Sequence, residues 1–572
     1  MPTISINCQD FEQLLGKARA ASTPITAADI EGWLPLVKGE LKDQDLELGE
    51  LRIELQDGNR PDLWSCEGMA RQVRIKLQGK PSSYPFFKSR HRPKRRLHVA
   101  PGLEEVRPYV AACAAIGYRV TEVGLAQLIQ TQEKLGELFG RKRHTISIGV
   151  YQLPQIAFPV TYALVKPDEA RFTPLGFEEK LSLGEILAVH PKGIEYGPII
   201  AGHERVPLLR DGEGQVLSLP PIINSREIGE VKVGDQKLFV EVTGTDLLMV
   251  ILTLNILSAN LADRGATIEA VEVVYPYKTR LGKTVRTPFD FGQARVIPIK
   301  TIESALGQRL GSEEVCRALS AYGYEARSAG NKVSVKPPPY RNDQMHAVDV
   351  VEDVAISRGY GAFTPLMPSQ FTVGSLSRVE QVSDRVRDLM VGVGFQEIIS
   401  NILSSRQELC DRMRLTGTAW EQLLEVDNVM SQSFACLRQW ITPSLLRVES
   451  ASTRAFYPHR LFEVGEVAVL DPTDDQGSRT VLTLGALVTH ANANFSEIHS
   501  CLDLLLYYLG YPYTLEPIHH PSFLGGRAGQ INSRGRAVGL IGELHPEVLE
   551  QWQVGMPGVV FELSVDALAE GT

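Results

Sequence analysis

The spacing of hydrophobic and polar positions changes several times along the chain, and each spacing predicts a different element. Residues 4–6 alternate apolar and polar side chains, and so do residues 51–55, which is typical of strands. Residues 66–77 have helical spacing, and the carboxylate of Asp62 stands where it can cap the start of that helix. The pattern therefore predicts a small α+β unit within residues 1–98.

The alternation returns at residues 237–246, where the predicted strand has two unlike faces. Leu238 and Val240 point to one side, whereas Glu241 and Thr243 point to the other. We therefore expect the Glu241 carboxylate outside the aliphatic layer. A polar corner should follow, because the first backbone N–H groups of the next helix need acceptors.

That next helix, residues 247–262, is apolar almost all round. It is shorter than the roughly 18 residues of a membrane span, and it contains Thr, Asn and Ser. We expect it in a protein core, and we expect no membrane partner. The first ten residues also lack the basic and apolar regions of a secretory signal.

Residues 296–370 predict a compact domain of helices with a short strand. Pro298 removes a backbone donor, so its strand is expected at the edge of a sheet. The helix at 311–322 is expected to begin with Ser312 as its N-cap. A helix and a turn of this kind are also found in DNA-binding domains, but the acidic character of this region disfavours that function.

The last 200 residues or so predict one α/β domain. Residues 379–393 have the spacing of an amphipathic helix, and a second helix is expected at 438–450. Strands are expected at 397–403 and 460–469.

The segment 337–361 gathers four carboxylates. Its three prolines predict an extended arm, and a helix follows. Asp349, Glu352 and Asp353 are spaced i, i+3 and i+4, so they share one helix face, and Asp343 can turn toward them from the arm. Like charges this close need a cation, and hard oxygen ligands suit Mg²⁺ or Ca²⁺. The alternative is an acidic helix face in solvent, which spacing alone leaves open.

The overall composition is that of an ordinary globular protein, with 43% hydrophobic and 22% charged residues. A chain of 572 residues is too long for one core, so several domains are expected. The formal charge of −9 argues against a protein that coats nucleic acid by bulk attraction. Seven cysteines without a CxxC pair favour free thiols in a reducing cytosol.

One segment has the opposite charge. Residues 88–98, KSRHRPKRRLH, form the densest basic run of the chain. Such a run is either a solvated linker or a loop that contacts the phosphates of a nucleic acid. The sequence leaves both interpretations open.

Several long strings point to a family. They are NRPDLWSCEGMARQVR at 59–74, YRND followed by HAVDVVEDVAI and GYG at 340–361, LRQWITPSLL at 437–446 and RLFEVGEV at 460–467. In these strings the chain resembles phenylalanyl-tRNA synthetase beta subunits, and the resemblance extends over nearly its whole length. The resemblance is to the archaeal and eukaryotic form of the family, which a few bacteria also use. Arg60 and Asp62 in the first string are expected to be structural.

The resemblance implies a role for each of two residue sets. In the family, the four carboxylates Asp343, Asp349, Glu352 and Asp353 contribute Mg²⁺ ligands at the border with the alpha subunit. ATP is used at the alpha subunit. The basic run becomes a candidate contact for tRNA phosphates.

The second set belongs to an editing domain, which hydrolyses tyrosine wrongly attached to the phenylalanine tRNA. The resemblance implies Leu209, Ser218, Glu241 and Thr243 as its pocket residues. A site that accepts Tyr and refuses Phe needs a polar partner for one hydroxyl group, and we expect Glu241 to be that acceptor.

The group that activates the hydrolytic water is not evident. No Ser/His/Asp or Cys/His set stands out, and a lone histidine such as His203 is more often structural. Arg527 and His545 lie in strings that resemble the catalytic-like domain of the family. We expect both to be structural, because no convincing second ATP-binding arginine accompanies them.

The predicted fold is a multidomain α+β and α/β protein. Its parts are an N-terminal α+β unit (1–98), an inserted mixed α/β editing domain (99–270), a return segment (271–295), a small helix-turn-helix-like domain (296–370) and a catalytically inactive class II synthetase-like antiparallel-sheet domain (371–572). The expected function is that of a cytoplasmic ligase subunit, in an (αβ)₂ heterotetramer with the alpha subunit, acting on tRNA(Phe). The alternative is a paralogous tRNA-binding or scaffold protein without ligase activity.

Overall fold

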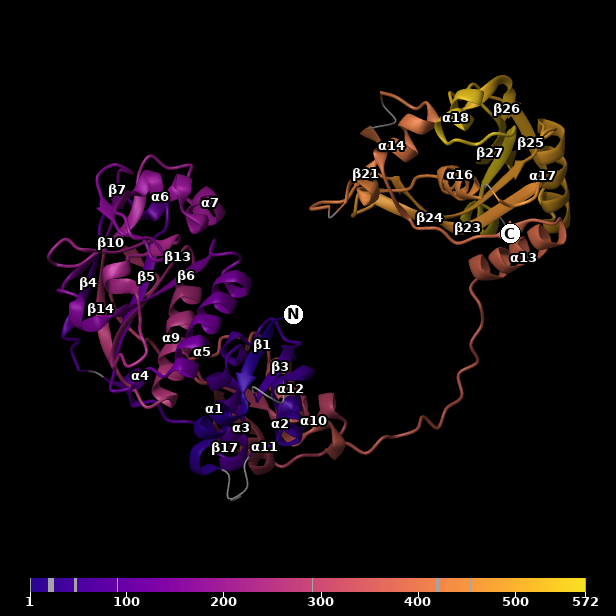
Figure 1. Cartoon of the computed structure of the whole chain (residues 1–572). Helices are drawn as coiled ribbons and strands as arrows, with labels where there is room; N and C mark the ends of the chain where they lie inside the picture. The colour runs from indigo at the N-terminus through magenta and orange to yellow at the C-terminus, as the bar shows by residue number, and fades with distance from the viewer. Residues whose placement is uncertain are drawn as a thin grey trace. The chain divides into compact units, whose positions relative to one another are not determined.

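The chain forms two compact units, Met1–Leu366 and Met367–Thr572 (Figure 1). The computed structural model describes residues 2–18, 25–45, 49–89, 91–290, 292–417, 421–429, 431–452 and 454–570.

The first unit begins with an antiparallel sheet of order β1-β3-β2 and the helices packed on it. Ile4, Ile53 and Phe11 are buried between them, so the predicted strands and helix are confirmed. The predicted helix cap is wrong. The Ser65 side chain accepts the Gly68 N–H, while Asp62 is bound to Arg60 instead. These elements are β1 (Thr3–Asn7), α1 (Cys8–Leu15), α2 (Ala27–Trp33), β2 (Gly39–Asp45), β3 (Glu50–Leu55) and α3 (Cys66–Gln78).

A larger sheet follows, with the order β12-β11-β10-β7-β4-β14-β5-β13-β6 and with β15 paired to β14. Its strands are β4 (Arg95–Val99), β5 (Tyr109–Ile116), β6 (Ile146–Gln152), β7 (Val160–Val165), β10 (Val206–Arg210), β11 (Val216–Leu219), β12 (Ile223–Asn224), β13 (Lys237–Gly244), β14 (Thr267–Thr279) and β15 (Gly282–Thr287).

The large sheet curls until its two ends approach each other. Asn224 on β12 donates to the Val150 carbonyl on β6, and Tyr151 on β6 contacts Ser218 on β11. Side chains, rather than a backbone ladder, therefore join the ends of this nearly closed barrel.

Two helices cover one face of this sheet, α5 (Glu122–Lys134) and α9 (Leu247–Asp263). As predicted, Leu238 and Val240 pack into the core that contains α9, whereas Phe239 packs into the core on the opposite face. The α9 core is continuous with that of the N-terminal sheet. Among the described helices, none combines the length and apolar character that a bilayer crossing requires.

The end of the first unit is a small domain with the sheet order β16-β18-β17. Pro298 lies in an edge strand, as predicted. The predicted cap at Ser312 is wrong by one residue, because Gly311 is the N-cap and the Ser312 hydroxyl bonds Ser328 instead. Its elements are β16 (Arg295–Pro298), α10 (Ile299–Leu306), α11 (Ser312–Ser320), β17 (Glu325–Ala329), β18 (Lys332–Lys336) and α12 (Ala347–Arg358).

The second unit is built on a seven-stranded sheet of order β19-β23-β24-β28-β27-β26-β25, in which only the β19–β23 pair is parallel. Its strands are β19 (Gln396–Glu397), β23 (His459–Leu470), β24 (Ser478–Thr489), β25 (Tyr513–Pro517), β26 (Phe523–Ser533), β27 (Arg536–Leu544) and β28 (Gly558–Ser564). The helices are α13 (Arg378–Gly392), α16 (Thr442–Ala451), α17 (Phe495–Leu509), α18 (Pro546–Gln551) and α19 (Val565–Ala569).

Two predictions for this unit are wrong. Residues 397–403 are not one strand, because β19 ends at Glu397 and Leu403 begins β20 (Leu403–Ser404) in a separate small sheet. The helix expected from Arg438 begins at Thr442. Arg438 instead follows the strand β22 (Cys436–Leu437), and its side chain is buried in an ion pair with Glu463.

Candidate functional site

A cavity of about 540 Å³ lies where the ends of the large sheet meet. Helix α5 contributes apolar side chains, Leu128 and Ile129, and the strand β6 adds Ile148. Ser218 and Glu241 provide polar groups on the same lining. A volume in this range suits a small organic group held mainly by apolar contacts and oriented by a few polar ones.

Glu241 lies in the middle of β13 and is 2% exposed. Its partner on the neighbouring edge strand β6 is Gly149. A Cβ atom on Gly149 would lie 2.5 Å from Glu241 Oε1 and 2.1 Å from the Tyr151 hydroxyl, so a side chain there would have to displace one of them. The glycine therefore gives the carboxylate the space that it occupies beside the cavity.

The two oxygens of this carboxylate differ. Oε1 accepts a hydrogen bond of 2.8 Å from the Tyr151 hydroxyl, which is also 2.8 Å from Ser218 Oγ. Oε2 is buried and has no hydrogen-bond partner among the described residues. Burial raises the pKa of Glu241 to about 7, and the bond from Tyr151 and the charge of Arg107 only partly oppose this. The site thus keeps one unused acceptor atom.

Tyr151 is fixed as a donor. Burial raises the pKa of its hydroxyl well above the usual value, and the Glu241 charge adds to the shift, so the proton stays on the oxygen. Ser218, Tyr151 and Glu241 therefore form a short hydrogen-bonded chain across the two sheet ends.

The other two predicted pocket residues lie elsewhere. Leu209 is fully buried in the apolar core on the Phe239 side of the sheet, and it does not line the cavity. The Thr243 hydroxyl contacts Ser147 Oγ at 2.9 Å and accepts from Arg107 Nε at 3.1 Å. Ser147 lines the cavity, so Thr243 contacts a residue of the lining without belonging to it.

Among the described residues that line this cavity, no nucleophile is hydrogen-bonded to a histidine or another general base. His203 is exposed and does not line it. Arg143 is the cation on the lining, where it donates to the carbonyls of Pro221 and Ile222 and stacks on the Tyr196 ring. The cavity can therefore bind and orient a molecule, but its residues do not supply an evident base.

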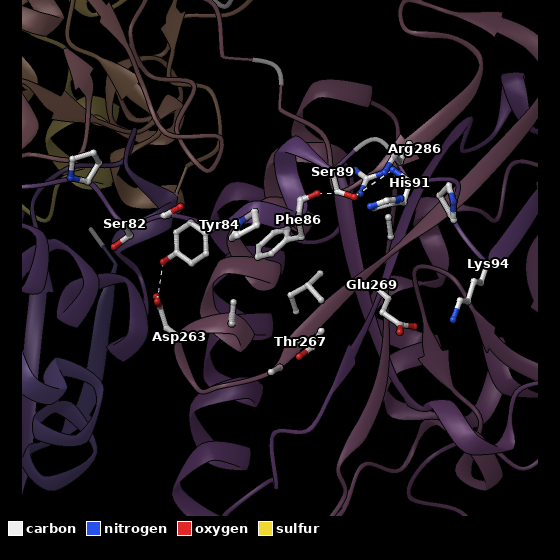
Figure 2. A pocket seen from close by; sticks show the side chains of 18 of the residues that line it. Ser82, Tyr84, Phe86, Ser89, His91, Lys94, Asp263, Thr267, Glu269 and Arg286 are labelled. Atoms are coloured by element: carbon white, nitrogen blue, oxygen red, sulfur yellow. Dashed lines mark hydrogen bonds between the residues drawn. The ribbon is translucent and has the colours of Figure 1, made fainter. Parts of the chain in front are cut away.

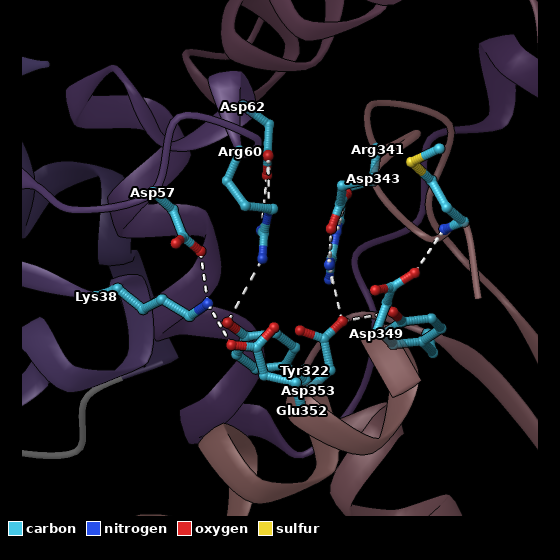
Figure 3. Close-up of polar contacts among 12 residues, drawn as sticks. Lys38, Asp57, Arg60, Asp62, Tyr322, Arg341, Asp343, Asp349, Glu352 and Asp353 are labelled. Carbon is cyan, nitrogen blue, oxygen red and sulfur yellow. Dashed lines mark hydrogen bonds and ion pairs between the residues drawn. The ribbon is translucent and has the colours of Figure 1, made fainter. Parts of the chain in front are cut away.

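The carboxylates of the small domain have a different environment (Figure 3). Arg341 is buried and forms ion pairs with Asp343 at 2.6 Å and with Asp353 at 2.7 Å. Burial alone would raise the pKa of Asp343, but Arg341 lowers it to about 2. Burial raises the pKa of Asp353 in spite of the same arginine.

The remaining two carboxylates point to other partners (Figure 3). Asp349 Oδ2 accepts the backbone N–H groups of Met345 and His346 at the start of α12. Glu352 is 46% exposed and pairs with Lys38 at 2.6 Å. Among the described residues, no group of three or more His, Cys, Asp or Glu is close enough to hold a metal ion. Hard oxygen donors suit Mg²⁺, but this arrangement does not by itself form a metal cage.

The same region contains a second buried pair. Arg60 binds Asp62 through two hydrogen bonds of 2.8 Å and also reaches the Tyr322 hydroxyl. Tyr322 in turn donates to the Leu36 carbonyl. These contacts join the N-terminal sheet unit to the small domain, in keeping with a structural role for Arg60 and Asp62.

Three residues of the Glu241 site had no evident sequence signal, whereas Arg341 of the carboxylate segment had one. Tyr151 is 90 residues from Glu241 in the chain, and Ser147 and Gly149 precede it on the edge strand β6. Arg341 stands beside Asp343 in the sequence, where its positive charge was the available clue that the carboxylates are already paired.

Known proteins resemble the chain along nearly its whole length. A phenylalanine–tRNA ligase beta subunit from Treponema pallidum is 40% identical over 525 residues, which is 91% of this chain and 86% of that protein. A protein of the same name from Borrelia recurrentis is 36% identical and aligns over 99% of this chain and 100% of its own length.

Family and structure comparisons agree with these relatives. Residues 364–565 match the phenylalanyl tRNA synthetase beta chain CLM domain, and residues 296–360 match the tRNA synthetase B5 domain. A crystal structure of an N-terminal fragment of the phenylalanyl-tRNA synthetase beta subunit from Pyrococcus horikoshii covers 63% of this chain and all of that fragment. Its TM-score is 0.58 and its identity 34%.

Proposed function

Because the chain belongs to the family of phenylalanyl-tRNA synthetase beta subunits, we propose that its Glu241 cavity hydrolyses Tyr-tRNA(Phe). The observation that carries this proposal is the buried, unpaired Oε2 atom of Glu241, a residue that lines a cavity of about 540 Å³. The names of the relatives favour a ligase subunit over a scaffold protein without ligase activity.

Selectivity follows from the cost of leaving a polar group unpaired. A tyrosine side chain entering the cavity presents a hydroxyl to Oε2, whereas phenylalanine presents a C–H group. A site built to bond a substrate hydroxyl rejects the analogue without it by a factor of about 10⁴. Because Oε2 is already buried without a partner, a tyrosine hydroxyl relieves that cost, whereas phenylalanine leaves it in place.

Binding of the hydroxyl also has an effect on Glu241 itself. The carboxylate has a raised pKa because few donors offset its burial. The phenol hydroxyl supplies a second donor, next to the one from Tyr151. Tyrosine therefore favours the ionised carboxylate, and phenylalanine does not.

The hydrolytic step is assigned to a water molecule. Hydroxyl groups on the lining, such as those of Ser218 and Ser147, can orient it, and the terminal ribose of the tRNA supplies the remaining polar groups. Arg143 on the lining has a position suited to the negative charge that develops on the ester oxygen. Leu209 and Thr243 support the lining from the core and from behind Ser147.

The proposal includes the assembly that the family name implies. The chain joins an alpha subunit in the cytoplasm as an (αβ)₂ ligase, in which the alpha subunit uses ATP to attach Phe to tRNA(Phe). Mg²⁺ would be held by Asp349 and Glu352 with ligands from that partner, because Arg341 already neutralises Asp343 and Asp353. The proposal includes the archaeal and eukaryotic form of the family.

The direct test is release of tyrosine from Tyr-tRNA(Phe) by the purified alpha–beta complex. We expect hydrolysis well above the spontaneous rate and little hydrolysis of Phe-tRNA(Phe). A complex that attaches Phe normally but leaves Tyr-tRNA(Phe) intact would contradict the editing proposal.

The metal proposal has a separate test. Asp349→Asn combined with Glu352→Gln should lower the Mg²⁺ content of the complex and weaken its assembly. The matched control is Glu313→Gln, an acidic residue in the first turn of α11. Unchanged metal content and assembly in the double variant would show that these carboxylates are a solvated face.

A further inference from the structure

A second cavity of the first unit, about 870 Å³, lies outside the Glu241 cavity and has no role in the function proposed above (Figure 2). The end of α9 and the strand β14 form one wall, and the helix α4 (Pro85–Lys88) forms another. The segment that leads into β4 forms its rim. That rim consists of residues 89 and 91–95, which belong to the basic run.

The lining is strongly cationic although the chain as a whole is acidic. Six Lys and Arg side chains line the cavity, against the two carboxylates of Asp263 and Glu269. Both carboxylates are already paired: Asp263 with Arg71 and Arg74, and Glu269 with Arg95. The cavity therefore attracts anions.

The ion pairs divide the basic run into two groups. Lys88, Arg95 and Arg96 are bound to Glu325, Glu269 and Glu272, respectively. Arg92 and Lys94 are exposed on the cavity rim and have no ion-pair partner among the described residues. A solvated linker would not hold three of its cations in ion pairs and present two more at a cavity.

The interior offers flat apolar surfaces. Tyr84 and Phe86 line the cavity, and their ring centroids are 5.7 Å apart (Figure 2). The Tyr84 hydroxyl donates to Asp263, and Arg286 donates to the Phe86 carbonyl, so both aromatic residues are held in place. Aromatic faces beside cations are the recurring means of binding unpaired nucleotides.

We propose that this cavity binds a phosphate-bearing nucleotide, with the base against Tyr84 and Phe86 and the phosphate at Arg92 and Lys94. The nucleotide is either an unpaired residue of an RNA chain or a free mononucleotide. Identification of the RNA as tRNA(Phe) rests on the function proposed above, but the binding chemistry does not.

The test uses the alpha–beta complex and compares wild type with Arg92→Ala/Lys94→Ala. Binding of tRNA(Phe) and of AMP is measured between 0.05 and 0.3 M salt. For the RNA, loss of two phosphate contacts should weaken affinity about tenfold near 0.15 M salt and reduce the salt slope by about 1.4. The control is Lys300→Ala/Lys332→Ala, which removes two exposed cations away from the cavity and should leave both quantities unchanged.

The second variant tests the aromatic wall. Phe86→Leu keeps an apolar side chain but removes the π-face, and it should weaken nucleotide binding about tenfold without changing the salt slope. If both variants affect tRNA, the nucleotide is part of an RNA chain; if they affect AMP alone, it is a free mononucleotide. Unchanged binding of both ligands in both variants would overturn the proposal.

Failure of the nucleotide-binding proposal can be distinguished from failure of the editing proposal. In the rim variant, hydrolysis of Tyr-tRNA(Phe) at saturating tRNA should stay at the wild-type rate, because the rim residues do not line the Glu241 cavity. If wild type does not hydrolyse Tyr-tRNA(Phe) but the rim variant still weakens RNA binding, only the editing proposal fails.

Discussion

Two buried carboxylate sites in the first unit show how differently the fold can treat the same chemical group. In the small domain, Asp343 and Asp353 lie against the buried guanidinium of Arg341. On β13, Glu241 has a single hydroxyl donor, and its second oxygen has no partner among the described residues.

The difference separates a structural site from a recognition site. A carboxylate paired with a buried cation has its hydrogen-bonding capacity used within the protein, which stabilises one arrangement of the chain. A buried carboxylate with a free oxygen destabilises the fold unless a ligand supplies a donor. The cost at Glu241 is therefore a reason to expect a ligand there, and the Arg341 pairs give no such reason.

The largest effect is expected when the cation of the structural site is removed. Arg341→Met removes the cation from two carboxylates, Asp343 and Asp353, and breaking a buried ion pair typically costs about 3–5 kcal/mol. Urea unfolding of the chain, followed by a probe in the small domain, measures the loss. The control Arg171→Met removes an exposed ion pair with Glu185, which water screens, so its effect on stability should be far smaller. Equal effects of the two variants would show that Arg341 does not have this role.

A pH-dependent effect should distinguish Glu241. Its pKa in the fold, about 7, is above the ordinary 4.5, so the folded chain keeps a proton that the unfolded chain releases between these values. Stability is therefore lost as the pH rises from 4.5 to 7, by about 3 kcal/mol at most. Glu241→Gln should be more stable than wild type at pH 8 and about equal at pH 4.5, as measured by the midpoint of thermal unfolding.

The control for that measurement is Glu227→Gln, since Glu227 is exposed on the helix α8 (Arg226–Gly229). The difference in unfolding midpoint between Glu227→Gln and wild type should be the same at pH 4.5 and at pH 8. If the unfolding midpoint of Glu241→Gln does not rise relative to that of wild type between pH 4.5 and pH 8, Glu241 is not a buried carboxylate with too few donors.

A smaller effect is expected from the donor to Glu241. Tyr151→Phe removes the hydroxyl that bonds Oε1 and Ser218, which leaves the carboxylate less well oriented. We expect kcat/KM for hydrolysis of Tyr-tRNA(Phe) to fall about tenfold. Tyr162→Phe is the matched control, because that buried tyrosine donates to the Arg107 carbonyl instead. A larger loss in the control than in Tyr151→Phe would argue against a specific role.

The smallest effect is expected at the exposed edge of the carboxylate segment. Lys38→Met removes the cation that Glu352 shares with Asp57. The Glu352 side chain is 46% exposed, so stability should change by less than about 1 kcal/mol. The same urea unfolding experiment measures it. A cost as large as that of Arg341→Met would mean that Glu352 also belongs to the structural site.

The sequence predicted the elements that carry these sites but only part of their surroundings. Alternation correctly placed Glu241 on the side of β13 opposite Leu238, and helical spacing correctly placed the carboxylates on α12. It did not reveal that the large sheet curls until β6 meets β11, because that contact depends on the twist of ten strands. Tyr151 and Gly149 therefore escaped notice.

The carboxylate segment shows a second limit of sequence reasoning. Helical spacing tells which side chains share a face, but not which cation lies closest to them. Asp343 and Asp349 are directed to different partners, Arg341 and the backbone at the start of α12, by contacts that spacing does not describe.

The central claim is that the free oxygen of Glu241 recognises the tyrosine hydroxyl. The most direct test is the ratio of kcat/KM values for hydrolysis of Tyr-tRNA(Phe) and Phe-tRNA(Phe), measured for wild type and Glu241→Ala in the alpha–beta complex. We expect the preference for Tyr to fall by at least about 100-fold in the variant, with attachment of Phe to tRNA near normal. An unchanged ratio would contradict the claim.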